Sequence, residues 1–350
     1  MNFQFIPKIE NSQFFLDVAF KAGTTSAERA RSVARGTRMD KSKEIELARI
    51  VTVKKTICKK LDGILKAFPS FDQLNPFYSG LVSCYIDIML AKKSLAAIAW
   101  ANGMIERVFL QSMSRIKRAQ ELPKINGYRR ALYGRASSLL KQIDDKLLYL
   151  EKVRYAMKGF PIIKEKYFTV AIAGFPNVGK TTLLSKLSGS TPEIKEYAFT
   201  TKSLNLGYME EGAKVQLIDT PGTLNRFEKM NYIEKQAYLA IEHCAQIIVY
   251  VFDVTEPYPL SDQKKLLEEL KNFGKPILFY LSKTDILSKE EQQKLEMPVL
   301  SLENLKKEVI EKAKVWEKER EEIEALAKEK ETTEEKGENT VDEEGDYEDY

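Results

Sequence analysis

The chain has 350 residues, 43% of them hydrophobic and 30% charged, which is enough to bury a sizeable core in two or three domains. Three widely spaced cysteines exclude a disulfide framework and a cysteine-rich zinc site, and the single histidine argues against a Ser-His-Asp or Cys-His catalytic apparatus. No apolar run reaches the roughly 18–20 residues that span a bilayer, and we expect no secretion signal at the N-terminus.

The net charge of +4 is unevenly distributed along the chain. Residues 1–160 carry 29 Lys and Arg against 14 Asp and Glu, residues 161–316 carry 21 of each class, and residues 317–350 carry 5 against 16. This asymmetry favours separate tasks for the parts of the chain. We predict a basic domain over 1–160, a second domain over 161–304, and a charged helix with an acidic tail over 305–350.

Two apolar stripes at helical spacing predict that the basic part is a helical bundle. The first comprises Val53, Ile57, Leu61, Ile64, Leu65 and Phe68, and the second Leu139, Leu140, Ile143, Leu147, Leu150 and Met157. The lysines of the first segment fall largely off its stripe: Lys54, Lys55, Lys59, Lys60 and Lys66. A solvated helix face explains a few such lysines, but the excess of charge over 160 residues favours phosphate contacts with RNA.

A second basic cluster lies nearer the N-terminus. Its members are Arg29, Arg31, Arg35, Arg38, Lys41 and Lys43. Because the surrounding segment is rich in Gly, Ser and Thr, we predict a loop or arm here.

Residues 174–181 read GFPNVGKT and fit the P-loop pattern G-x-x-x-x-G-K-[ST]. A buried strand over Tyr167–Ala173 precedes the loop and a helix over Thr182–Leu187, closed by Gly189, follows it, which argues against a simple glycine turn. Lys180 can reach the β- and γ-phosphates and the Thr181 hydroxyl can bind Mg²⁺. The predicted nucleotide-binding residues here are Gly174, Phe175, Pro176, Asn177, Val178, Gly179, Lys180, Thr181 and Thr182.

The sequence VQLIDTPG follows about forty residues later. It places Asp219 at a strand end, where the carboxylate can help to hold Mg²⁺, and Thr220, Pro221 and Gly222 beside the γ-phosphate. Between the two motifs, Thr201 is our candidate for a switch residue that closes over the nucleotide and completes the metal shell, with Thr200 as the alternative. We assign catalytic roles to Lys180, Thr201 and Gly222.

The base is expected to be read by the sequence SKTD at the end of the apolar run KPILFYL. The Asp285 carboxylate can accept hydrogen bonds from guanine, which adenine does not offer, and the stem of Lys283 can lie along the base. Ser282 stands where the usual N-K-x-D signature has Asn, a departure that affects the bracing of this pocket but not the guanine-reading carboxylate. Ser301 and Leu302 occupy the place of a further, weaker base-contacting element.

The predicted elements of this part alternate between strands and helices. We expect strands over Val215–Ile218, Ile247–Val254, Ile277–Leu281 and Pro298–Leu300, and helices over Ile233–His243 and Leu260–Phe273. The pattern predicts an α/β P-loop domain with a mostly parallel sheet and helices on both faces, preceded by an all-α bundle. The charged segment Leu305–Lys330 is expected to be a closing helix, and the acidic tail GENTVDEEGDYEDY to be disordered.

These motifs together resemble the Obg-like branch of translation-associated GTPases, and within it the nucleolar GTP-binding protein 1 family in a short, archaeal-like form. The resemblance covers about residues 45–285 and includes GFPNVGKTTLLSKLSG, LIDTPGTLNR and, in the basic part, RRALYGRASSLLKQIDDKLLYLEKVRYAM. It implies a GTPase with GTP/GDP and Mg²⁺ as ligands that acts in assembly of the large ribosomal subunit. The implied partners are large-subunit rRNA, the pre-ribosomal particle and ribosomal proteins, with no membrane or DNA partner. The implied location is cytoplasmic, or nucleolar in a eukaryote.

Two departures from Ras-like enzymes bear on the rate of hydrolysis. Thr223 follows D-T-P-G, where Ras-like proteins have the Gln that orients water, and no arginine finger is evident although Arg226 is nearby, so intrinsic hydrolysis should be slow. Asn177 stands where some related GTPases help to hold a K⁺ ion, but it can equally brace the loop. Two functions stay open: a GTPase switch that docks on rRNA, and a GTP-dependent switch whose helical domain grips a protein. Exposed Lys and Arg would favour the first, and a large exposed apolar patch the second.

Overall fold

The computed structural model describes residues 2–188, 193–194, 204–220, 230, 232–255, 259–288, 295 and 297–338. The chain divides into two compact units, of which the first spans Met1–Ile162 and the second begins at Ile163. The sequence placed this boundary at residue 160. Each unit is described by itself.

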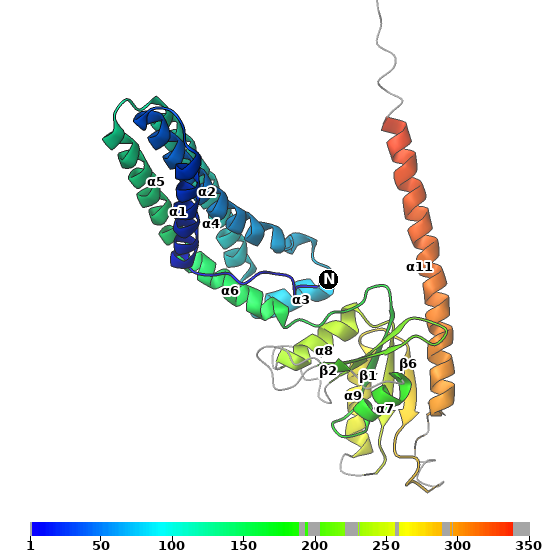
Figure 1. Ribbon diagram of the computed structural model, residues 1–350. Coiled ribbons are helices and arrows are strands. Elements are labelled where there is room, and N and C mark those ends of the chain that lie inside the picture. Colours follow the sequence, from blue (N-terminus) through cyan, green and yellow to red (C-terminus); the bar gives the residue numbers. More distant parts are fainter. Residues whose placement is uncertain are drawn as a thin grey trace, which may run out of the picture. The chain divides into compact units, whose positions relative to one another are not determined.

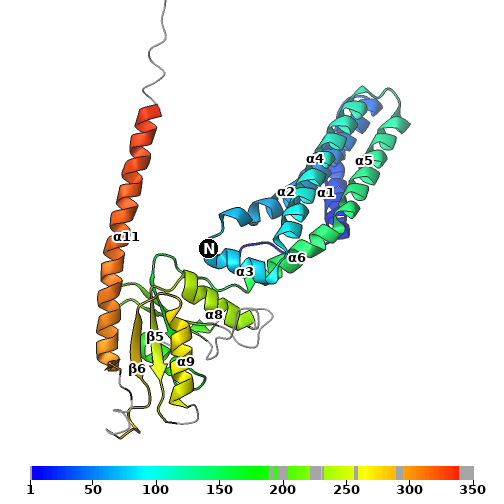
Figure 2. The same cartoon turned by 180° about the vertical axis from the view of Figure 1, so that it is seen from behind.

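The described secondary structure of the first unit consists of helices, as its apolar spacing predicts. Its helices are α1 (Ser12–Val33), α2 (Arg38–Ala67), α3 (Pro76–Tyr85), α4 (Ile88–Arg118), α5 (Leu122–Gln142) and α6 (Asp144–Lys158), with a short 3-10 turn at Phe71–Gln73. Helices α1, α2, α4 and α5 run side by side in both Figure 1 and Figure 2. Side-chain N-caps from Asn11, Thr37, Asn75 and Asp87 satisfy the first free backbone N–H groups of four helices.

The two predicted apolar stripes form the core of this unit. Val53, Ile57, Leu61 and Ile64 are buried on α2, while Leu65 of the same stripe is only partly buried. All six members of the second stripe are buried, but they do not lie on one helix, because α5 ends at Gln142, α6 begins at Asp144 and Ile143 lies between them. The lysines beside the first stripe are partly or fully exposed.

The prediction of a loop or arm around residues 29–43 is wrong. Five of the six basic residues of that cluster lie in α1 or α2, and only Arg35 lies between the two helices. Only residues 34–37 connect the two helices, and two small residues before the cluster bring α1 close to α2. A Cβ atom on Gly23 would lie 2.5 Å from Cγ2 of Val53 and 3.2 Å from the Arg49 carbonyl oxygen. Ser26 also meets the other helix, because its hydroxyl accepts a hydrogen bond from Thr52 at 2.9 Å.

The second unit is built on a seven-stranded sheet with the order β2-β3-β4-β1-β5-β6-β7. Its strands are β1 (Phe168–Ala173), β2 (Glu193–Ile194), β3 (Asn205–Met209), β4 (Val215–Asp219), β5 (Ile247–Phe252), β6 (Ile277–Leu281) and β7 (Val299–Leu300). All neighbours from β4 to β7 are parallel, whereas β3 is antiparallel to both β2 and β4. The predicted mostly parallel sheet is confirmed, and β3 is a strand that the sequence analysis missed.

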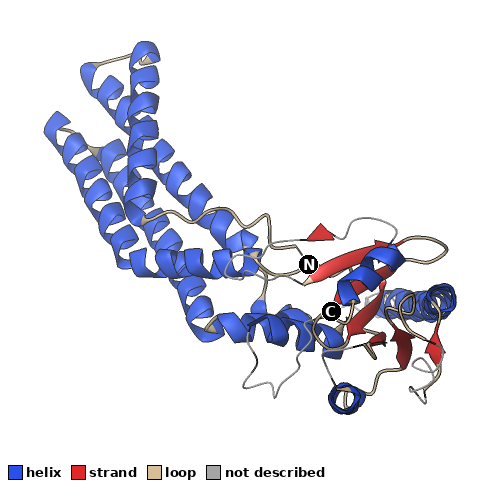
Figure 3. Cartoon of the chain, turned by 90° about the horizontal axis from the view of Figure 1, so that it is seen from below, coloured by secondary structure: helices blue, strands red, loops and turns tan. Residues whose placement is uncertain are grey.

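Helices lie on both sides of this sheet (Figure 3). Phe168, Val170 and Ile172 of β1 face a core shared with α7 (Lys180–Ser188) and the start of α11 (Leu302–Glu338). Ala171 and Ala173 face the opposite core, shared with α8 (Tyr232–His243) and α9 (Leu260–Lys271). The alternation of side chains along β1 therefore separates the two layers, and the central strands are buried on both faces.

The closing helix α11 begins inside the second unit and contributes to its core. Leu305, Val309 and Ala313 are buried against the sheet, so the predicted segment boundary at residue 305 falls within a packed helix. Farther along, Val315, Ile323 and Leu326 are exposed. The predicted disordered tail lies outside the described residues. None of the described helices combines the length and the apolar character needed to cross a membrane.

Candidate nucleotide-binding site

The loop between β1 and α7 has a backbone that only particular residues can adopt. Gly174 has φ +150°, and a Cβ atom there would lie 2.6 Å from the Val251 carbonyl oxygen of β5. Gly179 has φ +95°, and Asn177 has φ +62°, in the left-handed region that Asn tolerates better than most residues. A loop with such turns before a helix N-terminus presents backbone N–H groups to an anion.

Lys180 lies within this loop rather than in solvent. Its side chain is buried, and its Nζ donates a hydrogen bond of 2.7 Å to the Phe175 carbonyl oxygen. Burial lowers the pKa of Lys180, while the Asp219 carboxylate acts in the opposite direction. A cation held out of water in this way gains more from a nearby phosphate than an exposed lysine does.

Thr181 and Asp219 meet at the carboxyl ends of β1 and β4. The Thr181 hydroxyl donates to Asp219 Oδ2 at 2.6 Å, and Asn205 Nδ2 of β3 donates to the same oxygen at 3.0 Å. The other carboxylate oxygen, Asp219 Oδ1, is buried and has no hydrogen-bond partner among the residues that the structure describes. A hydroxyl beside a carboxylate with an unused oxygen is a donor set that suits Mg²⁺. The described part of the chain contains no group of three His, Cys, Asp or Glu residues that could hold a metal ion by itself.

Several other residues that are predicted to bind the phosphates make packing contacts or hydrogen bonds within the protein. Val178 is buried, Phe175 packs against both apolar cores, and Thr220 donates its hydroxyl to the Ile172 carbonyl oxygen at 2.9 Å. Pro176 is partly exposed and Thr182 is exposed. Five predicted positions lie outside the described residues: Thr200, Thr201, Pro221, Gly222 and Thr223, as does Arg226.

The predicted base-reading residues follow β6, but their side chains have different surroundings. Ser282 is buried and donates both its backbone N–H and its hydroxyl to the Phe252 carbonyl oxygen, at 2.9 and 3.0 Å. Asp285 is exposed and makes no hydrogen bond or ion pair with any residue that the structure describes. The serine that replaces the usual Asn therefore ties β6 to β5, and the carboxylate that is predicted to read guanine is exposed.

Lys283 is held by a network that the sequence analysis missed. With φ +54°, it forms an ion pair of 2.6 Å with Asp253 Oδ2 and also donates to the Thr255 hydroxyl at 3.2 Å. Asp253 is buried, and its Oδ1 accepts from both the N–H and the hydroxyl of Thr255. Gln263 of α9 holds the backbone of Asp253 from both sides. This network fixes the lysine whose stem is predicted to lie along the base.

The last predicted pair, Ser301 and Leu302, lies at the start of α11. The Ser301 hydroxyl accepts from the Asn304 N–H at 3.2 Å and so caps the helix, while Leu302 packs against the apolar core. Both side chains are thereby used in positioning α11 on the sheet.

Removing the anchor of Lys283 is expected to weaken nucleotide binding without changing hydrolysis of bound nucleotide. Asp253→Asn removes a charged hydrogen-bond acceptor, an interaction that typically contributes about 1.5–3 kcal/mol. We expect the Kd for GTP and for GDP to rise about tenfold together, as measured by titration calorimetry, and the single-turnover rate to stay within about twofold. Asp262→Asn, which removes an exposed ion pair with Lys265 on the same α9, is the control. A changed rate with unchanged Kd would contradict the positioning role of Asp253.

Comparison with known protein families matches both units. Residues 3–164 match the NOG1 N-terminal helical domain, and residues 169–283 match a family described as 50S ribosome-binding GTPase. The G domain of the FeoB iron transporter of T. maritima is 28% identical, with a TM-score of 0.35, over 41% of this chain and 98% of that chain.

Two relatives extend over most of the chain. "Uncharacterized protein MJ1408" of Methanocaldococcus jannaschii is 34% identical over 254 residues, which are 71% of each chain. Nucleolar GTP-binding protein 1 of Saccharomyces cerevisiae is 31% identical over 292 residues, which are 82% of this chain and 45% of that protein. The chain therefore matches less than half the length of the nucleolar relative.

Proposed function

Because the chain belongs to the family of nucleolar GTP-binding protein 1, we propose that it is a GTP-binding switch that hydrolyses GTP and acts in assembly of the large ribosomal subunit. The observation that carries the GTPase assignment is the meeting of Lys180, Thr181 and Asp219 at the ends of neighbouring parallel strands. This is the place where ligands bind in open α/β sheets. We place the protein where large subunits are assembled, in the cytoplasm, or in the nucleolus if the source is a eukaryote.

In this account the chain binds and orients the triphosphate. The backbone N–H groups of residues 174–179 other than Pro176 surround the β-phosphate, and Lys180 exchanges its contact with the Phe175 carbonyl for phosphate oxygens. Thr181 and Asp219 would hold Mg²⁺, which when bound supplies positive charge to the phosphate oxygens. Water then attacks the γ-phosphorus, the bond to the β–γ bridging oxygen breaks, and GDP and phosphate leave. Hydrolysis is slow in the free protein, because Thr223 cannot orient water as Gln does.

The proposed aid from potassium can be tested at Asn177. We expect GTP hydrolysis to be faster in K⁺ than in Na⁺ at matched ionic strength, because a bound cation adds charge where no arginine finger is evident. Asn177→Gly keeps the left-handed backbone that this position needs but removes the amide, so the difference between the two salts should disappear. Equal wild-type rates in both buffers would remove the potassium role and leave the GTPase assignment in place.

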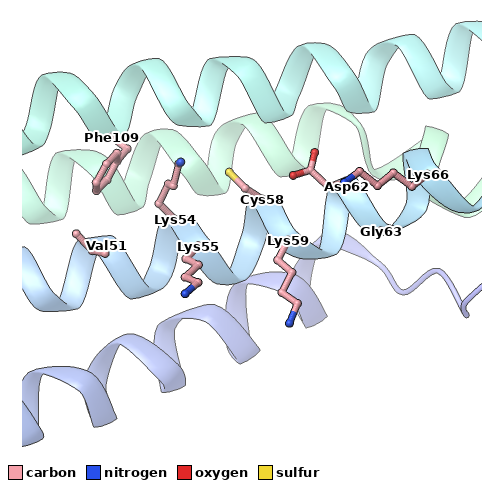
Figure 4. A pocket seen from close by; sticks show the side chains of 9 residues that line it. All are labelled: Val51, Lys54, Lys55, Cys58, Lys59, Asp62, Gly63, Lys66 and Phe109. Carbon is pink, nitrogen blue, oxygen red and sulfur yellow. The ribbon is translucent and has the colours of Figure 1, made fainter.

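The proposed rRNA contact lies on the helical unit, in a groove of about 540 Å³ that involves α2 and Phe109 of α4 (Figure 4). Lys54, Lys55, Lys59 and Lys66 line it. Lys54 points towards Phe109, with its Nζ 5.6 Å from the ring centre, and pairs with Glu106. Lys55 and Lys59 project to the other side and make no hydrogen bond or ion pair with any described residue. Unpaired cations beside a groove supply the electrostatic part of binding to RNA phosphates.

Reversing these two charges is expected to weaken binding to large-subunit rRNA and to reduce its salt dependence. In Lys55→Glu/Lys59→Glu, the slope of log Kd against log salt should fall by about 0.7–0.9 for each RNA phosphate that the protein no longer neutralises. Lys264→Glu/Lys265→Glu on α9 makes the same change in net charge on the second unit and is the control. Binding that is insensitive to salt, or equal in the two variants, would favour the alternative that the helical unit grips a protein partner. Exposed Met89 and Trp100 on α4 are the residues with which we would begin testing that alternative.

A further inference from the structure

A second cavity of the helical unit has a different chemistry from the lysine-lined groove. It has a volume of about 600 Å³ and is lined by residues of α1, α2 and α5. Five cationic side chains and one carboxylate reach it: Arg31, Arg38, Lys41, Arg49, Arg129 and Glu46. Four of the five cations are arginines, whereas all cations of the other groove are lysines.

In the inner part of this cavity, two arginines contact the carboxylate of the same glutamate. Glu46 is buried, and Arg129 Nη1 lies 3.3 and 3.4 Å from its two carboxylate oxygens. Arg49 Nε lies 3.4 Å from Oε2 of the same carboxylate and has no hydrogen-bond partner in the described part of the chain. These distances exceed the roughly 2.7–2.9 Å of strong charge-assisted hydrogen bonds, and most N–H donors of the two guanidinium groups stay unused. The single carboxylate of Glu46 therefore positions two arginines but leaves most of their hydrogen-bond donors unused.

The rim of the cavity adds three more cations. Arg31, Arg38 and Lys41 are exposed, and none of them makes a hydrogen bond or ion pair with a described residue. Asp40, an acid adjacent to Lys41 in the sequence, is used in the cap of α2, where its Oδ2 accepts from both the N–H and the hydroxyl of Thr37. The same cap provides hydrogen-bond partners for free backbone N–H groups at the start of α2. The positive charge of this site therefore comes from the arginines rather than from the helix end.

We propose that this cavity is a phosphate-binding site formed by Arg31, Arg38, Lys41, Arg49 and Arg129. The planar guanidinium group presents parallel N–H donors that match two phosphate oxygens at once, which the ammonium group of lysine does not. Glu46 holds two of these groups in place. The side-chain entropy lost when the ligand binds is therefore smaller than for freely moving arginines. The bound phosphate belongs either to the RNA backbone or to a free phosphate anion. The first form of the proposal rests on the proposed function, and the second is independent of it.

The free anion is tested on the full chain labelled with ¹⁵N-arginine and saturated with GDP and Mg²⁺, so that the P-loop is already occupied. Inorganic phosphate is titrated against chloride at equal ionic strength, and the Nε–Hε signals of the arginines are recorded. We expect saturable shifts of the Arg49 and Arg129 signals. Arg31→Gln/Arg38→Gln should raise the Kd at least about tenfold, while Arg31→Lys/Arg38→Lys, which keeps the charge, should give an intermediate loss.

The control is Arg35→Gln/Arg130→Gln, because these two arginines are exposed and do not line the cavity. It should change the Kd for phosphate by less than about twofold. The same variants are then compared for binding of a fluorescent hairpin RNA from the large subunit. If the ligand is backbone phosphate, the cavity variant loses at least about tenfold more RNA affinity than the control variant, and phosphate competes with RNA. If the ligand is a free anion, only phosphate binding is lost.

The proposal is overturned if no saturable shift occurs and the two variants bind RNA equally. If that happens while Lys55→Glu/Lys59→Glu still weakens RNA binding, the cavity proposal fails and the proposed function stands. A saturable phosphate shift in a protein that binds no RNA would support the cavity and contradict rRNA docking.

Discussion

Lys180→Ala is expected to remove nearly all GTP hydrolysis. The lysine is the buried cation of the phosphate loop, and its Nζ already lies within the loop, 2.7 Å from the Phe175 carbonyl oxygen. Loss of one such preorganised donor typically reduces the rate by about 10² to 10³. Single-turnover release of phosphate from bound GTP measures this effect. Lys186→Ala, which removes an exposed lysine from the same α7, should hydrolyse GTP at the wild-type rate.

The same substitution should not destabilise the nucleotide-free protein through loss of charge. Because burial lowers the pKa of Lys180 below its value in the unfolded chain, its charge opposes folding at a pH below both values. That unfavourable contribution disappears as the pH rises above the unfolded pKa. At neutral pH, thermal unfolding of nucleotide-free Lys180→Ala should therefore occur at the wild-type temperature or above it. Wild-type hydrolysis in this variant would contradict the assignment of the phosphate site.

Asp285→Asn is expected to change the preferred base from guanine to xanthine. The exposed Asp285 carboxylate can accept from two guanine N–H groups, and loss of such paired polar contacts can reduce affinity on the order of 10⁴-fold. Asn offers a donor to the 2-oxo group of xanthine, so affinity for xanthosine triphosphate should rise as that for GTP falls. Nucleotide titrations of both proteins measure this change in base preference. The gain in affinity for xanthosine triphosphate shows that the variant is folded. Wild-type protein that binds ATP as well as GTP would show that the guanine assignment is wrong.

The sheet could be predicted from the sequence because its elements carry local patterns. The P-loop needs a left-handed backbone at particular positions, so its glycines stand at fixed spacing, and Gly174 also allows close approach of Val251. Asp219 follows a short apolar run, which becomes β4, and parallel strands bring it to the same sheet edge as Thr181. Local spacing and strand direction were therefore sufficient for these residues.

The features that the sequence analysis missed depend on contacts between distant segments. Gly23 reads as a loop signal, but it allows α1 to approach Val53 of α2. Asp253 belongs to no motif that we used, and its role becomes visible only when β5 and β6 bring it to Lys283. Ser301 resembles part of a base-contacting element in its position, yet its hydroxyl caps α11. In each case the residue type allows several roles, and the tertiary neighbour decides between them.

The most direct test of the central claim is ultraviolet crosslinking of the protein to RNA in ribosomal particles, followed by sequencing of the crosslinked RNA. The protein is loaded with a non-hydrolysable GTP analogue in one sample and with GDP in the other. If the chain is a GTP-controlled switch on the large subunit, the crosslinks should concentrate at defined sites of large-subunit rRNA with the analogue and decrease with GDP. Crosslinks spread over both subunits in proportion to RNA abundance, or equal in the two nucleotide states, would contradict this account.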